Sequence, residues 1–193
     1  MRMKYAAVLA ATLFTAAACE IPLAPKWNID VFFPLKYPDV QLSQYAGPGG
    51  VIPTTPTAFT TPADSDDVAD ATAQVLDQDI ASIKADLIFI NQTNVLGNLR
   101  ISLAPNRLAL NSTNPAQAVT VTIPLHITPA TGDTIHVNVN PDLFANANKI
   151  YTQSSGDMRS GTGGLLIVGP TDRFRISVDL TANVPFSKEG GSQ

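Results

Sequence analysis

The stretch AVTVTIPLHIT, residues 118–128, alternates apolar and polar side chains along its whole length. Every odd position from Val119 to Ile127 is apolar, whereas the even positions between them carry threonine, proline and histidine. A period of two residues is typical of a β-strand that buries one face and exposes the other. Because Pro124 has no amide hydrogen to give to a neighbouring strand, we expect this strand to lie at a sheet edge or to contain a bulge.

The same alternation recurs on both sides of this stretch, and glycine, proline and asparagine separate the alternating segments. Further strands are predicted at 80–91, 97–104, 107–110, 133–140, 165–168 and 172–184. Many short strands with turn residues between them indicate an all-β protein, an antiparallel β-sandwich or a small barrel. The pattern loosely resembles the immunoglobulin-like sandwiches of exported proteins. We therefore predict an antiparallel β-sandwich with one or two short helices.

The two short helices are expected in the segments that interrupt the alternation. DDVADATAQVLDQ begins with Asp66 and Asp67, which are suitable N-caps, and carries its acidic residues in the first turn. NPDLFANANK, residues 140–149, predicts one or two helical turns after Pro141.

Two hairpins are predicted from the order of the strands. The turn NQTNVLG is expected to join 80–91 to 97–104, and PATG to join 118–128 to 133–140. In the second hairpin the apolar residues must share one core, so odd positions pair with odd ones and His126 lies opposite His136. Two imidazoles about 5 Å apart are weak candidates for a metal site, because no third ligand is evident.

The N-terminus has the layout of a secretory signal peptide. Arg2 and Lys4 form a short basic region, and an uncharged run follows to Ala18. The single cysteine, Cys19, comes directly after three alanines, and Glu20 and Pro22 end the apolar run too early for a membrane-spanning helix.

This segment resembles a bacterial lipobox, with Ala16 where the common pattern has leucine. The resemblance implies cleavage between Ala18 and Cys19 and lipidation of Cys19, which would hold the protein at a membrane through several acyl chains. Glu20 in place of aspartate implies the outer membrane by analogy with enteric lipoproteins. The alternatives are ordinary cleavage after Ala18 with a free thiol, and a buried core cysteine.

The chain divides by composition into five parts: a signal peptide (1–18), a lipid-anchored segment with a short strand (19–45), a Pro/Thr/Gly-rich linker or long loop (46–65), the sandwich (66–187) and a flexible tail (188–193). Within 19–45, IDVFF reads as a strand whose place in the main sheet is open. We expect Trp27, Phe32 and Phe33 to pack, because large aromatic side chains are costly to leave in water.

Charge and motifs exclude several classes of function. Cleavage after residue 18 removes Arg2 and Lys4, so the net charge falls from −4 to −6, and an acidic chain without a basic run argues against nucleic-acid binding. The sequence contains no GxSxG, HExxH, CxxC or phosphate-binding glycine loop. We therefore expect no enzyme activity and no cofactor.

Four other features are expected to be structural. The glycine-rich stretch 154–164 is expected to be a mobile hairpin loop, and the acidic group Asp64, Asp66, Asp67 and Asp70 a solvated helix start. Sequons begin at Asn91 and Asn111. Arg100, Arg173 and Arg175 are expected to be solvated or paired with carboxylates instead of forming a basic stripe.

The sequence therefore predicts a lipid-anchored cell-envelope protein that acts as a binding or structural module, facing the periplasm or the surface. Its partner would be another envelope protein or a glycan. The alternative is a carrier of an apolar ligand inside the sandwich, and an envelope enzyme is the third reading.

Overall fold

The computed structural model describes residues 27–35, 37–67, 81–144 and 147–186. The chain divides into two units, residues 30–184 and the terminal stretches 1–29 and 185–193. The sandwich described below is the unit of residues 30–184. Within the described residues, no helix combines the length and the apolar character that crossing a membrane requires.

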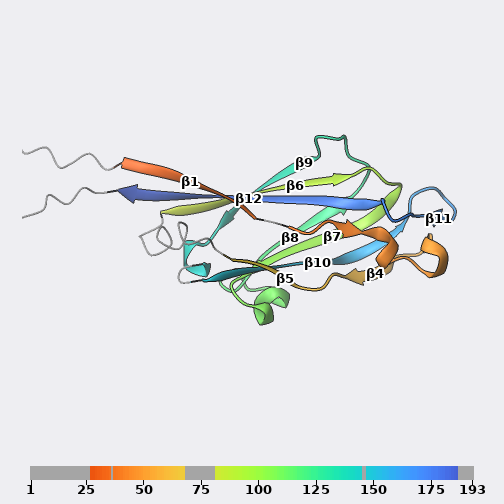
Figure 1. The fold of residues 1–193 in the computed structure, drawn as a ribbon, viewed down its shortest axis with the longest axis horizontal. Coiled ribbons are helices and arrows are strands. Elements are labelled where there is room, and N and C mark those ends of the chain that lie inside the picture. Colours follow the sequence, from red (N-terminus) through yellow and green to blue (C-terminus); the bar gives the residue numbers. More distant parts are fainter. Residues whose placement is uncertain (1–26, 36, 68–80, 145–146, 187–193) are drawn as a thin grey trace, which may run out of the picture. The chain divides into compact units, whose positions relative to one another are not determined.

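Two antiparallel five-stranded sheets enclose one apolar core, which confirms the predicted all-β sandwich (Figure 1). In the first sheet the strand order is β1–β12–β6–β9, and β2 pairs with the beginning of β12. Its strands are β1 (Trp27–Leu35), β2 (Val40–Gln41), β6 (Ser82–Asn91), β9 (Asp133–Val139) and β12 (Arg173–Phe186).

The second sheet has the order β4–β10–β7–β8, and β5 also pairs with β10. Its strands are β4 (Thr57–Thr60), β5 (Asp64–Asp67), β7 (Val95–Ala104), β8 (Val119–Leu125) and β10 (Lys149–Ser160). A separate ribbon pairs β3 (Val51–Ile52) with β11 (Leu166–Ile167). The single-turn 3-10 helices are η1 (Leu42–Gln44), η2 (Pro48–Gly50), η3 (Arg107–Asn111) and η4 (Pro141–Leu143).

The core is built from the apolar positions of the alternating strands. In β6 and β12 every second residue is buried: Ile83, Ala85, Leu87 and Phe89 on one strand, and Phe174, Ile176, Val178, Leu180, Ala182 and Val184 on the other. The rings of Phe89 and Phe174 meet edge to face at 5.7 Å between centroids, a favourable aromatic geometry. The predicted inward faces of these strands are confirmed, except that Ala81, just before β6, is exposed.

The stretch 118–128 forms β8 at the edge of the second sheet, as Pro124 requires. Its alternation holds as far as Leu125, where the strand ends. Beyond it the pattern reverses: Ile127 is 57% exposed and Thr128 is buried, because the chain leaves the sheet here and crosses to the other one.

Both predicted hairpins are wrong. β6 pairs with β12 and β9, whereas β7 pairs with β10 and β8, so the turn at 92–94 joins two sheets instead of two paired strands. The same holds for β8 and β9, which lie in different sheets. Alternation fixes which side chains point inward, and both sheets of a sandwich have an inward face, so the pattern leaves the choice of sheet open.

Two short strands were also predicted wrongly. Residues 107–110 form η3 because Asn106 precedes them and its Oδ1 accepts a hydrogen bond from the amide of Ala109, 3.0 Å away. Residues 165–168 are not a central strand. Only Leu166 and Ile167 pair, in the ribbon with β3, and Leu165 and Ile167 are exposed.

The Pro/Thr/Gly-rich segment 46–65 belongs to the sandwich and is not a linker. It forms β3 and β4 and the start of β5, and it buries Ile52 and Phe59. Its strands pair with β10 and β11, about 100 residues later, so no local pattern reveals them.

The short strand predicted at IDVFF is confirmed as β1, which lies beside β12. The prediction that Phe32 packs against the protein is wrong, because its side chain is 61% exposed. The side chains of Trp27 and Phe33 lie outside the described part.

Residues 66 and 67 belong to β5, and the rest of the predicted helix falls on 68–80, outside the described residues. The helical turn after Pro141 is confirmed as η4. The stretch 154–164 is not a hairpin loop, since Ser154 to Ser160 form the second half of β10.

Candidate functional site

Ala18 and Cys19, the predicted cleavage and lipidation site, lie outside the described residues. The signal peptide of residues 1–18 and the tail 188–193 do so as well. The lipobox therefore stays a prediction from sequence.

The two histidines lie apart, and each pairs with its own carboxylate. His126 Nε2 lies 2.9 Å from Asp133 Oδ2 in the connection between β8 and β9. His136, on β9, places Nδ1 2.7 Å from Oδ1 of Asp86 on the neighbouring strand β6. The predicted pairing of His126 with His136 is wrong, because β8 and β9 do not pair. Among the described residues no three potential metal ligands gather in one place.

The arginines do not form a basic stripe. Arg100 lies on β7 of the second sheet, whereas Arg173 and Arg175 lie on β12 of the first. Arg173 pairs with Asp39 at 3.2 Å, as expected of a solvated strand residue.

The acidic group starts a strand instead of a helix, since Asp64 to Asp67 form β5. Lys149 on β10 lies 3.0 Å from Asp67, and this hydrogen bond and charge raise the pKa of Lys149. Of the two sequons, Asn91 is fully buried and hydrogen-bonded, whereas Asn111 is exposed at the end of η3.

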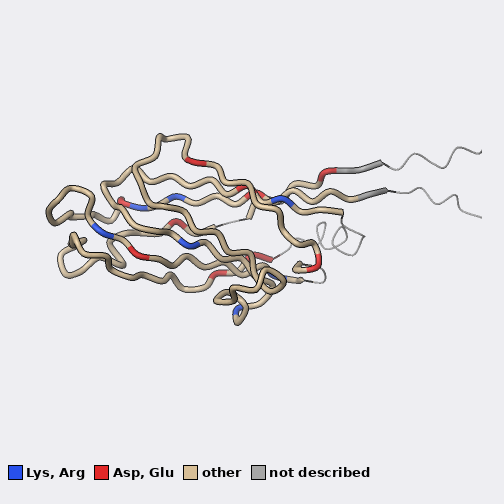
Figure 2. Tube along the Cα trace, turned by 180° about the vertical axis from the view of Figure 1, so that it is seen from behind, with Lys and Arg blue, Asp and Glu red and all other residues tan. Residues whose placement is uncertain are grey.

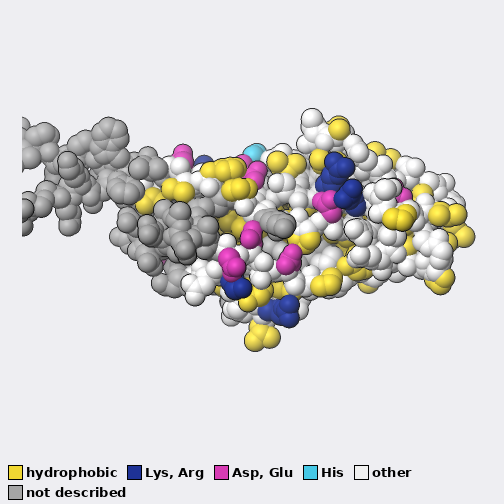
Figure 3. Space-filling model, in the orientation of Figure 1, with side chains coloured by type: hydrophobic (Ala, Val, Ile, Leu, Met, Phe, Trp, Pro, Cys, Tyr) yellow, Lys and Arg dark blue, Asp and Glu magenta, His cyan; other side chains and the backbone are white. Residues whose placement is uncertain are grey.

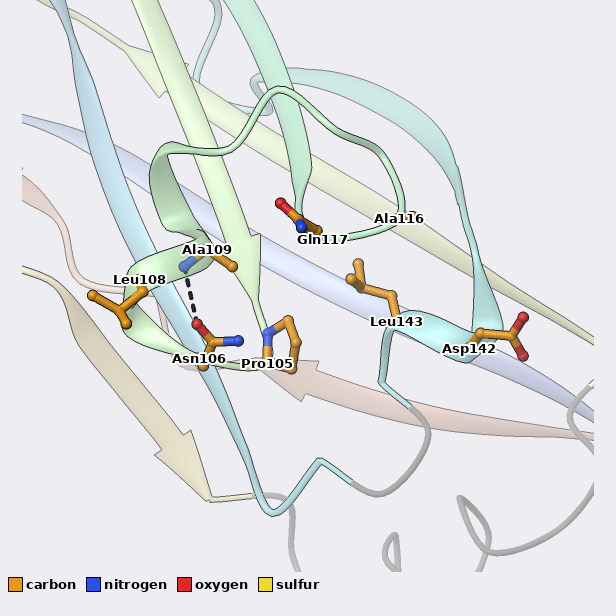
Figure 4. A pocket seen from close by; sticks show the side chains of 8 residues that line it. All are labelled: Pro105, Asn106, Leu108, Ala109, Ala116, Gln117, Asp142 and Leu143. Carbon is orange, nitrogen blue, oxygen red and sulfur yellow. Dashed lines mark hydrogen bonds between the residues drawn. The ribbon is translucent and has the colours of Figure 1, made fainter.

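A shallow open pocket of about 330 Å³ lies between η3, the 115–118 turn and η4 (Figure 4). The residues lining it are Pro105, Asn106, Leu108, Ala109, Ala116, Gln117, Asp142 and Leu143. Apolar side chains line it together with two side-chain amides, of Asn106 and Gln117, and the carboxylate of Asp142. Pockets with this mixture bind ligands through apolar contact and a few oriented hydrogen bonds.

Asparagine caps fix both 3-10 turns that build the pocket. Asn106 Oδ1 caps η3, drawn as the dashed line in Figure 4, and Asn140 Oδ1 accepts from the amide of Asp142 at 3.1 Å. Gln117 is also held, because Ser112 Oγ donates to its Oε1 at 2.8 Å. The rim is thus ordered before any ligand arrives.

The pocket was missed by sequence reasoning although its signals are present. Asparagine before a short turn is a typical cap, and both PNRLALN and NPDLF contain one. The sequence does not reveal that the two turns lie close together, because they come from chain segments about 35 residues apart.

Comparisons with known proteins give no family. No family model matches the chain, and no curated protein matches it. Among solved structures, a chain of Desmodium yellow mottle tymovirus aligns over 86% of this chain and 93% of its own length, with 14% identity and a TM-score of 0.33.

Proposed function

We propose that this chain is a lipid-anchored protein of the bacterial cell envelope, held at the outer membrane through Cys19, whose β-sandwich acts as a binding or structural module. The lipobox-like sequence supports the anchor. The partner would be an envelope protein or a glycan, held at the pocket between η3 and η4.

The observation that carries the proposal is where the chain enters and leaves the sandwich. Asp30 Oδ1 accepts a hydrogen bond from Nδ2 of Asn183 at 2.8 Å, so both ends of the unit of residues 30–184 lie together. The 12 residues from Cys19 to Asp30 span at most about 40 Å. A tether that joins the sandwich at Asp30 leaves the surfaces distant from Asp30 and Asn183 open to a partner.

Replacing Cys19 with serine tests the anchor. The wild-type protein is expected in the membrane fraction, with an intact mass that corresponds to a chain starting at Cys19 plus acyl groups. Cys19→Ser removes the thiol that carries the lipid and is expected to release the protein. A wild-type mass equal to that of the bare polypeptide would contradict the proposal.

The pocket is tested by what co-purifies with the lipidated protein from native membranes. Ala116→Trp fills the pocket from an exposed position and is expected to remove the partner. Ala81→Trp, exposed just before β6, serves as the control. Equal recovery of the partner with both variants would place the binding surface elsewhere.

A further inference from the structure

The end of the sandwich that carries β3 and β11 presents two exposed aliphatic side chains. Leu165 is 70% exposed and Ile167 is 74% exposed, whereas Leu166 between them packs against the core. Alternation on an extended chain therefore points Leu165 and Ile167 to the same outer side, about 7 Å apart. Figure 3 shows apolar side chains at this end of the molecule, the right end in that view.

Charge is absent from the two segments that build this end. Residues 42–63 and 160–171 contain no Asp, Glu, Lys or Arg. The corresponding loops stay free of red and blue in Figure 2, whereas the strands carry charges along their length. Two charged residues flank the second segment: Arg159, which is exposed, and Asp172, which is half-buried and whose Oδ2 accepts from the amide of Gly169 at 2.7 Å.

Several polar groups of the loop before β11 are bound internally. Ser160 Oγ lies 2.9 Å from Thr162 Oγ1 and accepts from the amide of Thr162 at 3.2 Å. The amides of Ser160 and Gly161 donate to Pro53 O and Asn94 O, both at 2.7 Å. Groups that are already hydrogen-bonded cost less to remove from water than free ones.

The ribbon is also held in place by the backbone. β11 pairs with β3, and the amide of Val168 donates to Gly50 O at 2.8 Å. Gly50 has a positive φ of 74°, and a Cβ built there would lie 2.4 Å from Val168 O. Glycine at 50 therefore permits the close approach that fixes Leu165 and Ile167 outward.

We propose that this tip, residues 161–167, inserts Leu165 and Ile167 into the interface of an uncharged lipid bilayer. A stable protein partner needs about 800 Å² on each side, far more than two side chains supply. A bilayer needs no matching shape, and binding to its interface grows with the apolar area that is buried there. The inference does not rest on the lipid anchor, because it concerns a different surface.

The test uses the full chain carrying Cys19→Ser, so that no acyl group contributes. An environment-sensitive fluorophore is attached through Leu165→Cys, or through Thr122→Cys as the control, since Thr122 is exposed on β8 and lies outside the pocket. With phosphatidylcholine vesicles, the fluorescence of the label at 165 is expected to shift to the blue and gain intensity, and that of the label at 122 to stay unchanged.

A second substitution separates the tip from other routes to the vesicle. Ile167→Asp brings a charge into the tip and is expected to weaken the response at 165 at least tenfold. Ile127→Asp, in the exposed β8–β9 connection, is expected to leave it intact. No fluorescence response at 165, or an equal response at 122, would overturn the proposal. A response at 165 that rises with protein concentration in the absence of vesicles would also overturn it, and would indicate that a second copy of the chain covers the tip.

Discussion

Asn91 is the buried residue on which two crossings between the sheets converge. Its Nδ2 donates to Val95 O and His126 O, both at 3.0 Å, and its Oδ1 accepts from the amide and the hydroxyl of Thr93. Its backbone also bonds to Thr128. One side chain thus fixes the β6–β7 connection through Thr93 and Val95, and the β8–β9 connection through His126.

Asn91→Ala is expected to lower the free energy of unfolding by about 2–4 kcal/mol. The substitution removes the partners of two carbonyls and one amide in a place that water does not reach easily. Asn111→Ala, at the exposed asparagine of the other sequon, is the control and should change stability by less than about 0.5 kcal/mol. Urea denaturation measures both, and similar losses for the two variants would contradict this role.

Tyr37 joins the two layers through a buried hydrogen bond. It precedes β2 of the first sheet, and its hydroxyl lies 3.0 Å from Oγ of Ser154 on β10 of the second. Ser154 is held in turn by Thr61, which donates its amide to Ser154 O at 2.8 Å. Burial raises the pKa of Tyr37 well above its usual value of 10.0, and the bond to Ser154 lowers the pKa by less.

Stability is therefore expected to fall at alkaline pH. Above pH 10 the unfolded chain releases the phenol proton while the folded chain keeps it, so the contribution of Tyr37 is complete below pH 10 and is lost as pH rises toward the raised pKa. The slope is about 1.4 kcal/mol per pH unit. Urea denaturation between pH 8 and 11 should show a smaller decline in the free energy of unfolding for Tyr37→Phe than for the wild type. Identical declines would contradict a contribution from Tyr37.

At the scale of elements, the alternation of side chains predicted the strands but not their partners. Inward residues such as Leu87, Leu99 and Val178 could be identified because period two depends only on neighbours in sequence. Pairing depends on contacts far along the chain: β12 lies beside β6, and β10 beside β7. The Pro/Thr-rich segment was misread for the same reason, since β4 receives its hydrogen bonds from β10.

The contact between β7 and β10 depends on two glycines. Gly156 has a φ of 154°, and a Cβ there would lie 2.0 Å from Asn98 O; Gly97 faces Asp157 O in the same way at 2.1 Å. Both strands therefore approach each other more closely here than side chains allow.

Gly156→Ala is expected to destabilise the protein by at least about 2 kcal/mol, because the new methyl group collides with backbone that the sheet holds in place. Gly164→Ala is the matched control. Nothing lies within 4 Å of a Cβ at that position, so its unfolding free energy should change by less than about 0.5 kcal/mol. Thermal or urea denaturation compares the two, and a neutral Gly156→Ala would show that the strands can separate locally without cost.

At the scale of the whole molecule, the sequence predicted a sandwich but not the surfaces on it. The pocket between η3 and η4 and the tip at Leu165 and Ile167 both arise where separate segments meet. Composition could not reveal either, because a leucine at 165 reads as core until its neighbours are known. The lipobox differs, since a processing signal is recognised as linear sequence.

The ion pairs described for this sandwich lie at its surface, so its stability should depend little on salt. Among the described residues, Lys149 pairs with Asp67 and Arg173 pairs with Asp39, and both pairs are solvent-accessible; the less exposed one joins Arg173 and Asp39, whose side chains are 41% and 35% exposed. Exposed pairs contribute little and are screened by salt, whereas the burial of Phe89, Phe174 and Leu99 is not. Between 0.05 and 0.5 M NaCl the thermal midpoint is expected to move by no more than about 3 °C. Sodium sulfate, which strengthens apolar burial, should raise it. A large fall of the midpoint in NaCl would mean that ion pairs, and not the shared apolar core, hold the two sheets together.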